Sequence, residues 1–198
     1  AELLDFITDL AAANSEFPVF RAVHAVAASH AGDDSTARRL LEEERRRGFD
    51  SAHEMQWATA ATLWTEVIVR LEHVEAAAEL YPLLVPFERL TAFTGLTYGG
   101  PLSFQAGRLA VLLGRLDDAD AHLALSLGVA EQSDDPFLLA GTRLTQGRSL
   151  LQRAHRDGDD SLIARAEEAG SQALDVARAR GFGCIELDAL ELLGGLRG

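Results

Sequence analysis

The stretch GRLAVLLGRLDDADAHLALSL, residues 107–127, decides the fold. Its first part is apolar, and Gly114 interrupts it with the residue type that most often ends a helix. Leu116, Leu123 and Leu127 follow at the spacing of one helix face. The stretch therefore predicts two helices that fold back on each other across a tight turn. A pair of this kind cannot bury its apolar face alone, so we expect similar pairs on either side of it.

The rest of the chain predicts an all-α fold of about four antiparallel helix pairs. Strand signals are almost absent, because apolar residues nowhere alternate with a period of two. We expect residues 1–198 to form a single domain that is a fragment of a larger protein. The predicted pairs cover residues 17–49, 51–86, 101–134 and 136–181, after a leading helix at 2–13 and before a short capping helix at 184–193.

Local signals predict where several helices begin. Asp34 or Ser35 is expected to cap the second helix of the first pair. Ser51 and Glu54 have the spacing of a capping box at the start of the second pair. Residues 87–100 form the one long irregular stretch. Long loops are often functional, but disorder or simple spacing between two pairs explains this one equally well.

An internal repeat supports the array of pairs. Four alanines, separated by 40, 42 and 47 residues, align the second helices of the pairs: Ala37, Ala77, Ala119 and Ala166. A small residue precedes each alanine in the first helix: Ala25, Thr65, Gly107 and Gly147. Small residues at both positions allow two helices to cross closely. Gly170 departs from the pattern, because a large apolar residue stands four positions after each of the other three alanines.

This pattern resembles the tetratricopeptide (TPR) repeat, a helix-turn-helix unit with small residues at its eighth and twentieth positions. The units here are longer than the usual length of about 34 residues. The resemblance implies a TPR-like α-solenoid, which is a right-handed superhelix. A bundle of four helix pairs is the alternative interpretation, because it would give a similar sequence pattern.

Residues 22–182 also resemble a particular family region. The similarity rests on LYPLLVPFERL (80–90), the opening stretch, DDPFLLAGTRLTQGRSLL (134–151) and ALDVARARGF (173–182). These stretches are similar to the C-terminal helical-repeat region of large actinobacterial signalling ATPases, which include LuxR-type transcriptional regulators and adenylate-cyclase-like proteins. The resemblance implies a regulatory segment, with ATP bound by an upstream domain of the parent protein. Some members of that family end in a DNA-binding helix-turn-helix.

The composition excludes several classes of function. The net charge is −13, and so acidic a surface repels phosphate backbones, so we expect no direct binding of nucleic acid. All 18 basic residues are arginine, which leaves no lysine for a P-loop or a Schiff base. No apolar run is long enough to span a membrane, so no membrane partner is expected. The single cysteine fits a cytoplasmic protein.

No constellation of residues points to an enzyme. The six histidines form no pair at i, i+4 spacing, and one cysteine cannot build a thiolate zinc site. Asp117, Asp118 and Asp120 lie in the first turn of a predicted helix, where the helix dipole favours acidic residues. We therefore expect no catalytic residue, no metal and no cofactor in this segment.

The candidate binding surface follows from the TPR resemblance. In such arrays the first helix of each pair lines the concave face, which could hold an acidic peptide or a small anionic effector. The alternative is that the arginines of this surface pair with neighbouring acids. Carried over to this chain, the inner positions are His30, Glu66, Arg70, Phe104, Arg108, Arg148 and Gln152.

These observations predict a non-enzymatic protein–protein interaction and regulatory module, whose partner is a protein, a peptide or an adjacent domain. The alternative is a domain that senses a small-molecule effector directly. Arg38, Arg39 and residues 45–47 form a basic patch, which either pairs with neighbouring glutamates or docks an acidic partner. Ile185, Leu192 and Leu193 either cap the core or join two copies in a homodimer; both alternatives agree with the spacing.

Overall fold

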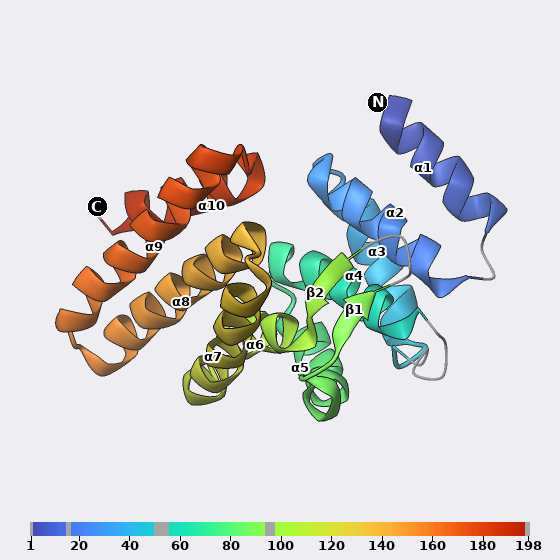
Figure 1. Ribbon diagram of the computed structural model, residues 1–198. Coiled ribbons are helices and arrows are strands. Elements are labelled where there is room, and N and C mark those ends of the chain that lie inside the picture. Colours follow the sequence, from blue (N-terminus) through green and yellow to red (C-terminus); the bar gives the residue numbers. More distant parts are fainter. Residues whose placement is uncertain (1, 15–16, 50–55, 94–97, 197–198) are drawn as a thin grey trace. The chain divides into compact units, whose positions relative to one another are not determined.

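The computed structural model describes residues 2–14, 17–49, 56–93 and 98–196. These residues form ten α-helices, one 3₁₀ turn and one two-stranded hairpin, which confirms the predicted all-α class (Figure 1). The chain divides into two compact units, Ala1–Gln105 and Ala106–Gly198, and the boundary lies within helix α6 (Leu102–Leu112). The expected single domain over residues 1–198 stays a prediction.

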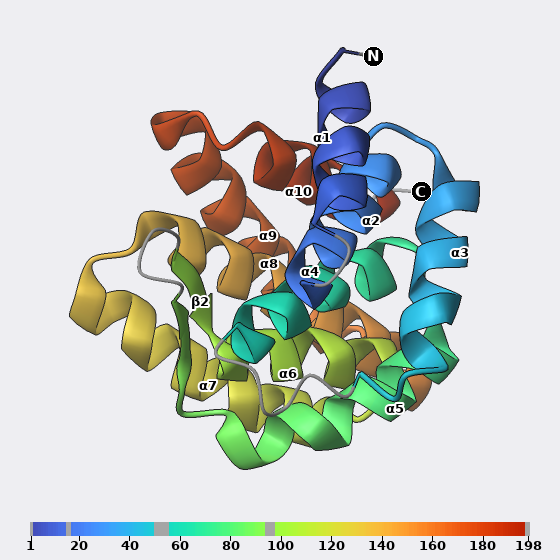
Figure 2. The same ribbon diagram turned by 90° about the vertical axis from the view of Figure 1, so that its right-hand side faces the viewer.

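The described part of the first unit is built on two helix pairs that follow a leading helix. Helix α2 packs against α1, α3 and α4, and the C-terminal end of α3 meets α5 (Figure 2). Ala25, Ala37, Thr65 and Ala77 are fully buried, as expected for positions where helices cross closely. The helices are α1 (Glu2–Ala13), α2 (Pro18–His30), α3 (Asp34–Arg45), α4 (Trp57–Arg70) and α5 (Val74–Leu84), and the 3₁₀ turn Val85–Phe87 follows them.

The cap of α3 differs from the prediction by one residue. Asp33, rather than Asp34 or Ser35, is the N-cap, and its Oδ1 accepts a hydrogen bond from the backbone N–H of Thr36 at 3.1 Å. The Ser35 hydroxyl donates to the same oxygen at 2.7 Å. These hydrogen bonds, led by the one from Ser35, lower the pKa of Asp33 to about 2. The predicted capping box at Ser51 and Glu54 lies outside the described residues.

A hairpin occupies part of the stretch that we expected to be irregular. Strand β1 (Thr91–Phe93) pairs antiparallel with β2 (Tyr98–Pro101), so α6 begins at Leu102 rather than at Pro101. Two strands of three and four residues are too short to show an alternating pattern in the sequence. A Cβ on Gly99 would lie 3.0 Å from Cβ of Ala92 and 3.6 Å from Cγ2 of Thr62, so glycine allows the hairpin to lie close to α4.

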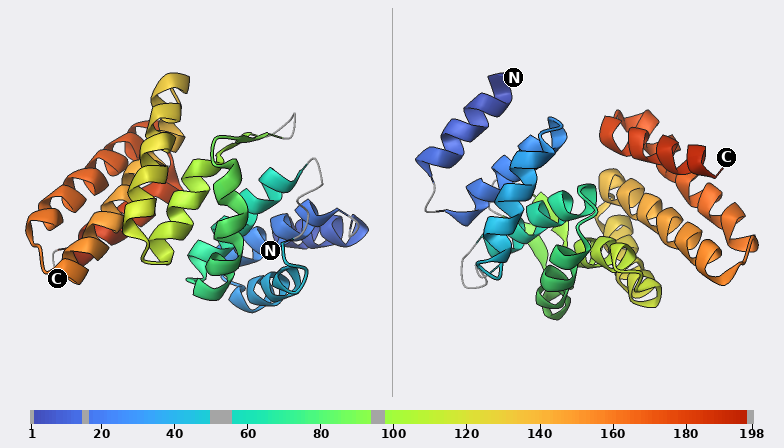
Figure 3. Two further views of the ribbon diagram at one scale, coloured as in Figure 1. Left: turned by 90° about the horizontal axis from the view of Figure 1, so that it is seen from below. Right: turned by 180° about the vertical axis from the view of Figure 1, so that it is seen from behind.

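The second unit continues from α6 with four long helices. Figures 1 and 3 show α8, α9 and α10 as neighbours, and α7 packs against α8. Helix α8 continues to Asp157 and ends at Gly158, which has a φ of +67°. The helices are α7 (Leu116–Ser133), α8 (Pro136–Asp157), α9 (Ser161–Arg180) and α10 (Gly183–Gly195).

The opening stretch forms the predicted pair of helices, α6 and α7. Gly114 lies between them with a φ of +69°, a conformation that favours glycine. A Cβ on Gly107 would lie only 2.7 Å from Cδ2 of Leu123, so the small residue permits the close approach of the two helices. The local prediction from this stretch is confirmed.

The fourth pair, α8 and α9, shows why Gly170 departs from the repeat. A Cβ on Gly147 would lie 3.2 Å from the carbonyl oxygen of Ala166 and 2.8 Å from Cδ2 of Leu192. A Cβ on Gly170 would lie 3.2 Å from the side chains of both Leu192 and Leu193. The two glycines therefore leave a slot into which the leucines of α10 pack. A large residue at position 170 would occupy that slot.

Helix α10 closes the core of the second unit. Ile185, Leu192 and Leu193 are each at most 7% exposed and belong to the same apolar cluster as residues of α8 and α9. Of the two alternatives for these three side chains, the structure therefore shows that they cap the core. The Phe182 ring, just before α10, makes an edge contact with the Phe137 ring at the start of α8.

Candidate functional site

Three predicted residues of the candidate binding surface come together in the first unit. The Nε2 atom of His30, at the end of α2, lies 3.4 Å from Oε1 of Glu66 in α4. One turn further along α4, Nε of Arg70 donates a hydrogen bond to the carbonyl oxygen of Ser29 at 3.0 Å. The side chains of His30 and Glu66 are 46% and 32% exposed, so this surface is open to a partner.

The other four predicted residues occur as two pairs, each with one helical turn between its members. Phe104 and Arg108 are half-buried on α6. Arg148 and Gln152 lie on α8, where Nη2 of Arg148 is 3.3 Å from Oδ2 of Asp188 in α10. Arg148 thus has an acidic neighbour, as the alternative interpretation of these arginines expects.

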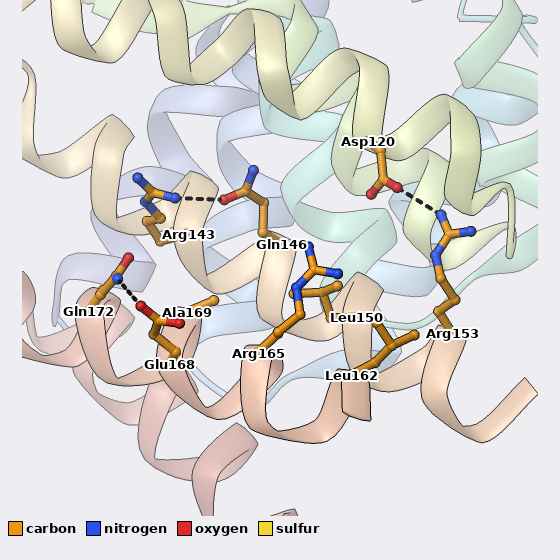
Figure 4. Close-up of a pocket in the computed structure, with 10 residues that line it drawn as sticks. All are labelled: Asp120, Arg143, Gln146, Leu150, Arg153, Leu162, Arg165, Glu168, Ala169 and Gln172. Atoms are coloured by element: carbon orange, nitrogen blue, oxygen red, sulfur yellow. Dashed lines mark hydrogen bonds and ion pairs between the residues drawn. The ribbon is translucent and has the colours of Figure 1, made fainter. Parts of the chain in front are cut away.

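A feature that the sequence did not indicate is a cavity of about 370 Å³ between α7, α8 and α9 (Figure 4). We call it the α8–α9 cavity, since nine of its ten lining residues belong to these two helices. Its walls combine three arginines, two acids and two glutamines with three apolar residues. The lining residues are Asp120, Arg143, Gln146, Leu150, Arg153, Leu162, Arg165, Glu168, Ala169 and Gln172.

One of the three cavity arginines has its charge fully matched. Nη1 of Arg153 lies 2.8 Å from Oδ1 of Asp117, and Nη2 lies 2.7 Å from Oδ2 of Asp120. These contacts, led by the hydrogen bond to Asp117, raise the pKa of Arg153. The hydroxyl of Ser149 donates to the other oxygen of Asp120 at 3.4 Å. This end of the cavity is therefore a closed ionic network between α7 and α8.

The other two cavity arginines have no acidic partner among the described residues. Nη1 of Arg143 donates only a long hydrogen bond, 3.4 Å, to Oε1 of Gln146. Arg165 makes no hydrogen bond or ion pair with any described residue, and Figure 4 shows its side chain extending from α9 toward Gln146 and Leu150. The guanidinium groups of Arg143 and Arg165 therefore keep their donors available to a ligand.

The remaining lining residues give the cavity an apolar floor and a polar edge. Leu162 and Ala169 are 9% and 8% exposed, and Leu150 lies beside them. Glu168 accepts a hydrogen bond from Nε2 of Gln172 at 3.2 Å, so part of its capacity to accept hydrogen bonds is already used within α9. The arrangement combines cationic donors with a smaller apolar area, which suits a ligand with an anionic head and a small apolar body.

The residues that line the cavity follow the period of a helix in the sequence. Residues 143, 146, 150 and 153 recur every three or four positions along α8, and residues 162, 165, 169 and 172 do so along α9. Each set forms one stripe on its helix. Whether the two stripes face each other depends on how the helices cross, and that crossing is a tertiary property.

Two of the five arginines in the predicted basic patch pair with glutamates, while Arg38 and Arg46 donate to backbone carbonyls. Arg39 bonds Glu43 at 2.8 Å. Arg45 contacts Glu42 at 2.7 Å and reaches Glu79 of α5 at 2.6 Å. The hydrogen bonds from Arg45 hold the pKa of both of these glutamates below the usual range. For Arg39 and Arg45, this pattern agrees with the interpretation that the patch pairs with neighbouring glutamates.

The comparison with protein families, curated proteins and solved structures finds no significant match. Among the described residues, no group of three or more histidine, cysteine or carboxylate side chains is arranged so that it could hold a metal ion. Within the described residues, no helix has both the length and the apolar character needed to cross a membrane.

Proposed function

We propose that this chain is a non-enzymatic interaction and regulatory module with a TPR-like arrangement of its helix pairs. We further propose that it belongs to a larger cytoplasmic protein, either an ATP-dependent signalling protein or a LuxR-type transcriptional regulator. The family resemblance of residues 22–182 supports the second part. The close packing at Gly107 and Gly147, where the TPR pattern requires small residues, supports the first.

The observation that carries the proposal is the surface formed by His30, Glu66 and Arg70. The repeat alignment assigned these residues to one face. His30 of α2 contacts Glu66 of α4, and Arg70 contacts the carbonyl of Ser29, the residue before His30. Surfaces that display polar side chains from successive first helices are suited to peptide recognition. Binding of a partner would favour one state of the attached ATPase by its differential affinity for the two states.

The partner of this surface is expected to be an acidic peptide segment. Arg70, Arg108 and Arg148 lie at positions of the first helices, and arginine binds carboxylates through paired hydrogen bonds. Since the chain as a whole carries a charge of −13, a partner attracted to it needs such local cationic sites. The small-molecule effector is the second candidate function, and the α8–α9 cavity is the observation that favours it.

The test is selection of peptides from a displayed library on the intact chain, followed by measurement of Kd for the enriched sequences. We expect acid-rich sequences, and we expect the Arg70→Glu and Arg108→Glu variants to bind them at least about tenfold more weakly, because one charge-assisted hydrogen bond is worth about 1.5–3 kcal/mol. Arg178→Glu is the control, since Arg178 is exposed and already pairs with Glu186 at 3.0 Å.

Two outcomes of this selection would contradict the proposal. One is a set of enriched peptides without acidic bias, and the other is equal affinity for the wild-type chain and both charge-reversed variants. Thermal unfolding of each variant separates lost binding from lost structure. Arg148→Gln adds a further check, because it removes the charge without placing a second acid beside Asp188.

A further inference from the structure

We infer that the α8–α9 cavity binds a small organic monocarboxylate, which is held by Arg143 and Arg165. The inference rests on the second candidate function, direct sensing of a small molecule, and gives it a site and a ligand class. It does not depend on the surface formed by His30, Glu66 and Arg70, so the two proposals stand or fall separately.

The first observation that supports a ligand site is the lack of an acidic partner for Arg143 and Arg165 among the described residues. The chain has 31 acidic and 18 basic residues, so acids are plentiful as partners for its arginines. Yet neither Arg143 nor Arg165 contacts an acid among the described residues, while Arg153 in the same cavity contacts two. Guanidinium groups bind carboxylates with paired, charge-assisted hydrogen bonds. The cavity therefore offers two such groups to an anion that the chain itself does not supply.

The charge balance of the cavity sets the charge of its ligand. Among the lining residues, the charges of Arg153 and Asp120 cancel each other; Asp117, the second acid that contacts Arg153, is 91% exposed and does not line the cavity. Arg143 and Arg165 together carry two positive charges, and Glu168 supplies one negative charge at the edge. The balance that remains is one positive charge. A ligand with a single negative charge matches it, whereas a second negative charge would meet Glu168.

The volume and the floor of the cavity set the size of the ligand. A volume of about 370 Å³ is near the small end of the range known for ligand sites, roughly 300–1,000 Å³. Leu150, Leu162 and Ala169 form an apolar surface that would be covered by a short aliphatic or aromatic body. The amide groups of Gln146 and Gln172 lie at the polar side and can donate to the carboxylate. These features together define a short monocarboxylate rather than an extended peptide.

The experiment uses hexanoate as the probe, with hexanol and hexylamine as comparators of the same chain length. Binding to the intact chain is followed by NMR of the arginine Nε–Hε groups, assigned by substitution. We expect saturable binding of hexanoate, with shifts at Arg143 and Arg165, and much weaker binding of hexanol and hexylamine. Arg143→Gln and Arg165→Gln should each raise the Kd at least about tenfold. Arg178→Gln, at an arginine already paired with Glu186, should leave it unchanged.

Several results would overturn the inference. Equal binding of hexanol would show that only the apolar floor contributes, and equal binding by the Arg143→Gln and Arg165→Gln variants would show that the site lies elsewhere. Absence of saturable binding of hexanoate and of benzoate would also refute it. Acidic peptides whose affinity falls in the same two variants would assign the cavity to a protein partner. The peptide test on Arg70 and Arg108 uses variants of different residues, so none of these results changes its outcome.

Discussion

Replacing Gly147 by alanine tests whether α8 and α9 cross as closely as the repeat requires. The new Cβ would lie 3.2 Å from the carbonyl oxygen of Ala166 and 2.8 Å from Cδ2 of Leu192. The leucine can rotate away, but the carbonyl belongs to the backbone of α9 and moves only if that helix moves. Gly128 of α7 provides a matched control, because it is also inside a helix and a Cβ there would meet no atom within 4 Å.

Two effects, helix propensity and crowding of the interface, predict that Gly128→Ala and Gly147→Ala change the free energy of unfolding differently. Alanine is favoured over glycine inside a helix by about 1 kcal/mol, and this gain applies at both positions. Forcing an extra methyl group into a packed interface costs about 1–3 kcal/mol. Gly128→Ala should therefore raise the free energy of unfolding by up to about 1 kcal/mol. Gly147→Ala should leave it unchanged or lower it by up to about 2 kcal/mol, so the two variants should differ by about 1–3 kcal/mol.

Urea unfolding followed by far-UV circular dichroism measures this difference. Tryptophan fluorescence is less suitable, because the two tryptophans, Trp57 and Trp64, both lie on α4 in the first unit. If Gly147→Ala and Gly128→Ala stabilise the chain equally, then α8 and α9 have room for a side chain at their crossing. That result would refute the argument that the repeat places small residues where the helices touch.

Two further predictions concern the pairing of α3 with its neighbours. Arg45→Gln should raise the pKa of Glu42 and Glu79 toward ordinary values, as NMR titration of the carboxyl groups would show; unchanged titration would contradict the assigned cause. In the wild-type chain these lowered pKa values contribute stability that is present above the unfolded-state values and is lost as the pH falls through the folded-state values, so Arg45→Gln should flatten the stability profile between about pH 3 and 5. Glu44 is 2% exposed and pairs with Arg21 at 3.1 Å, so Glu44→Ala should lower the free energy of unfolding by about 3–5 kcal/mol in urea titrations. A loss below about 1 kcal/mol, as for an exposed ion pair, would refute a structural role for this contact.

The helices were largely predictable because their ends are marked by local chemistry. Asp135 and Pro136 begin α8, with the Asp135 carboxylate accepting a hydrogen bond from the N–H of Leu138. Gly181 ends α9 with a φ of +73°. These signals act within one helical turn and do not depend on the rest of the fold. The cap of α3 was misplaced by one residue because Asp33, Asp34 and Ser35 are all good caps, and the sequence alone does not rank them.

The hairpin and the cavity were not predictable because both depend on contacts between distant segments. β1 and β2 are too short to alternate visibly, and their position follows from packing on α4. The α8–α9 cavity requires two polar stripes, one on each helix, to face each other. In the sequence Arg165 is indistinguishable from a solvated arginine, and only the structure shows that it makes no ion pair with a described acid. The seven residues of the candidate surface were assigned by alignment, and the structure joins three of them directly in the first unit.

The slot that holds Leu192 and Leu193 also sets an order of events in folding. Pairing of α8 with α9 needs nothing from α10, and a turn of only three residues joins these two helices, so loop closure costs little. Docking of α10 needs Gly147 and Gly170 to be in place together, so it follows that pairing. In the reverse direction α10 can detach while α8 and α9 stay paired. Amide hydrogens of α10 should therefore exchange with solvent through this partial opening, ahead of those in the centre of α8.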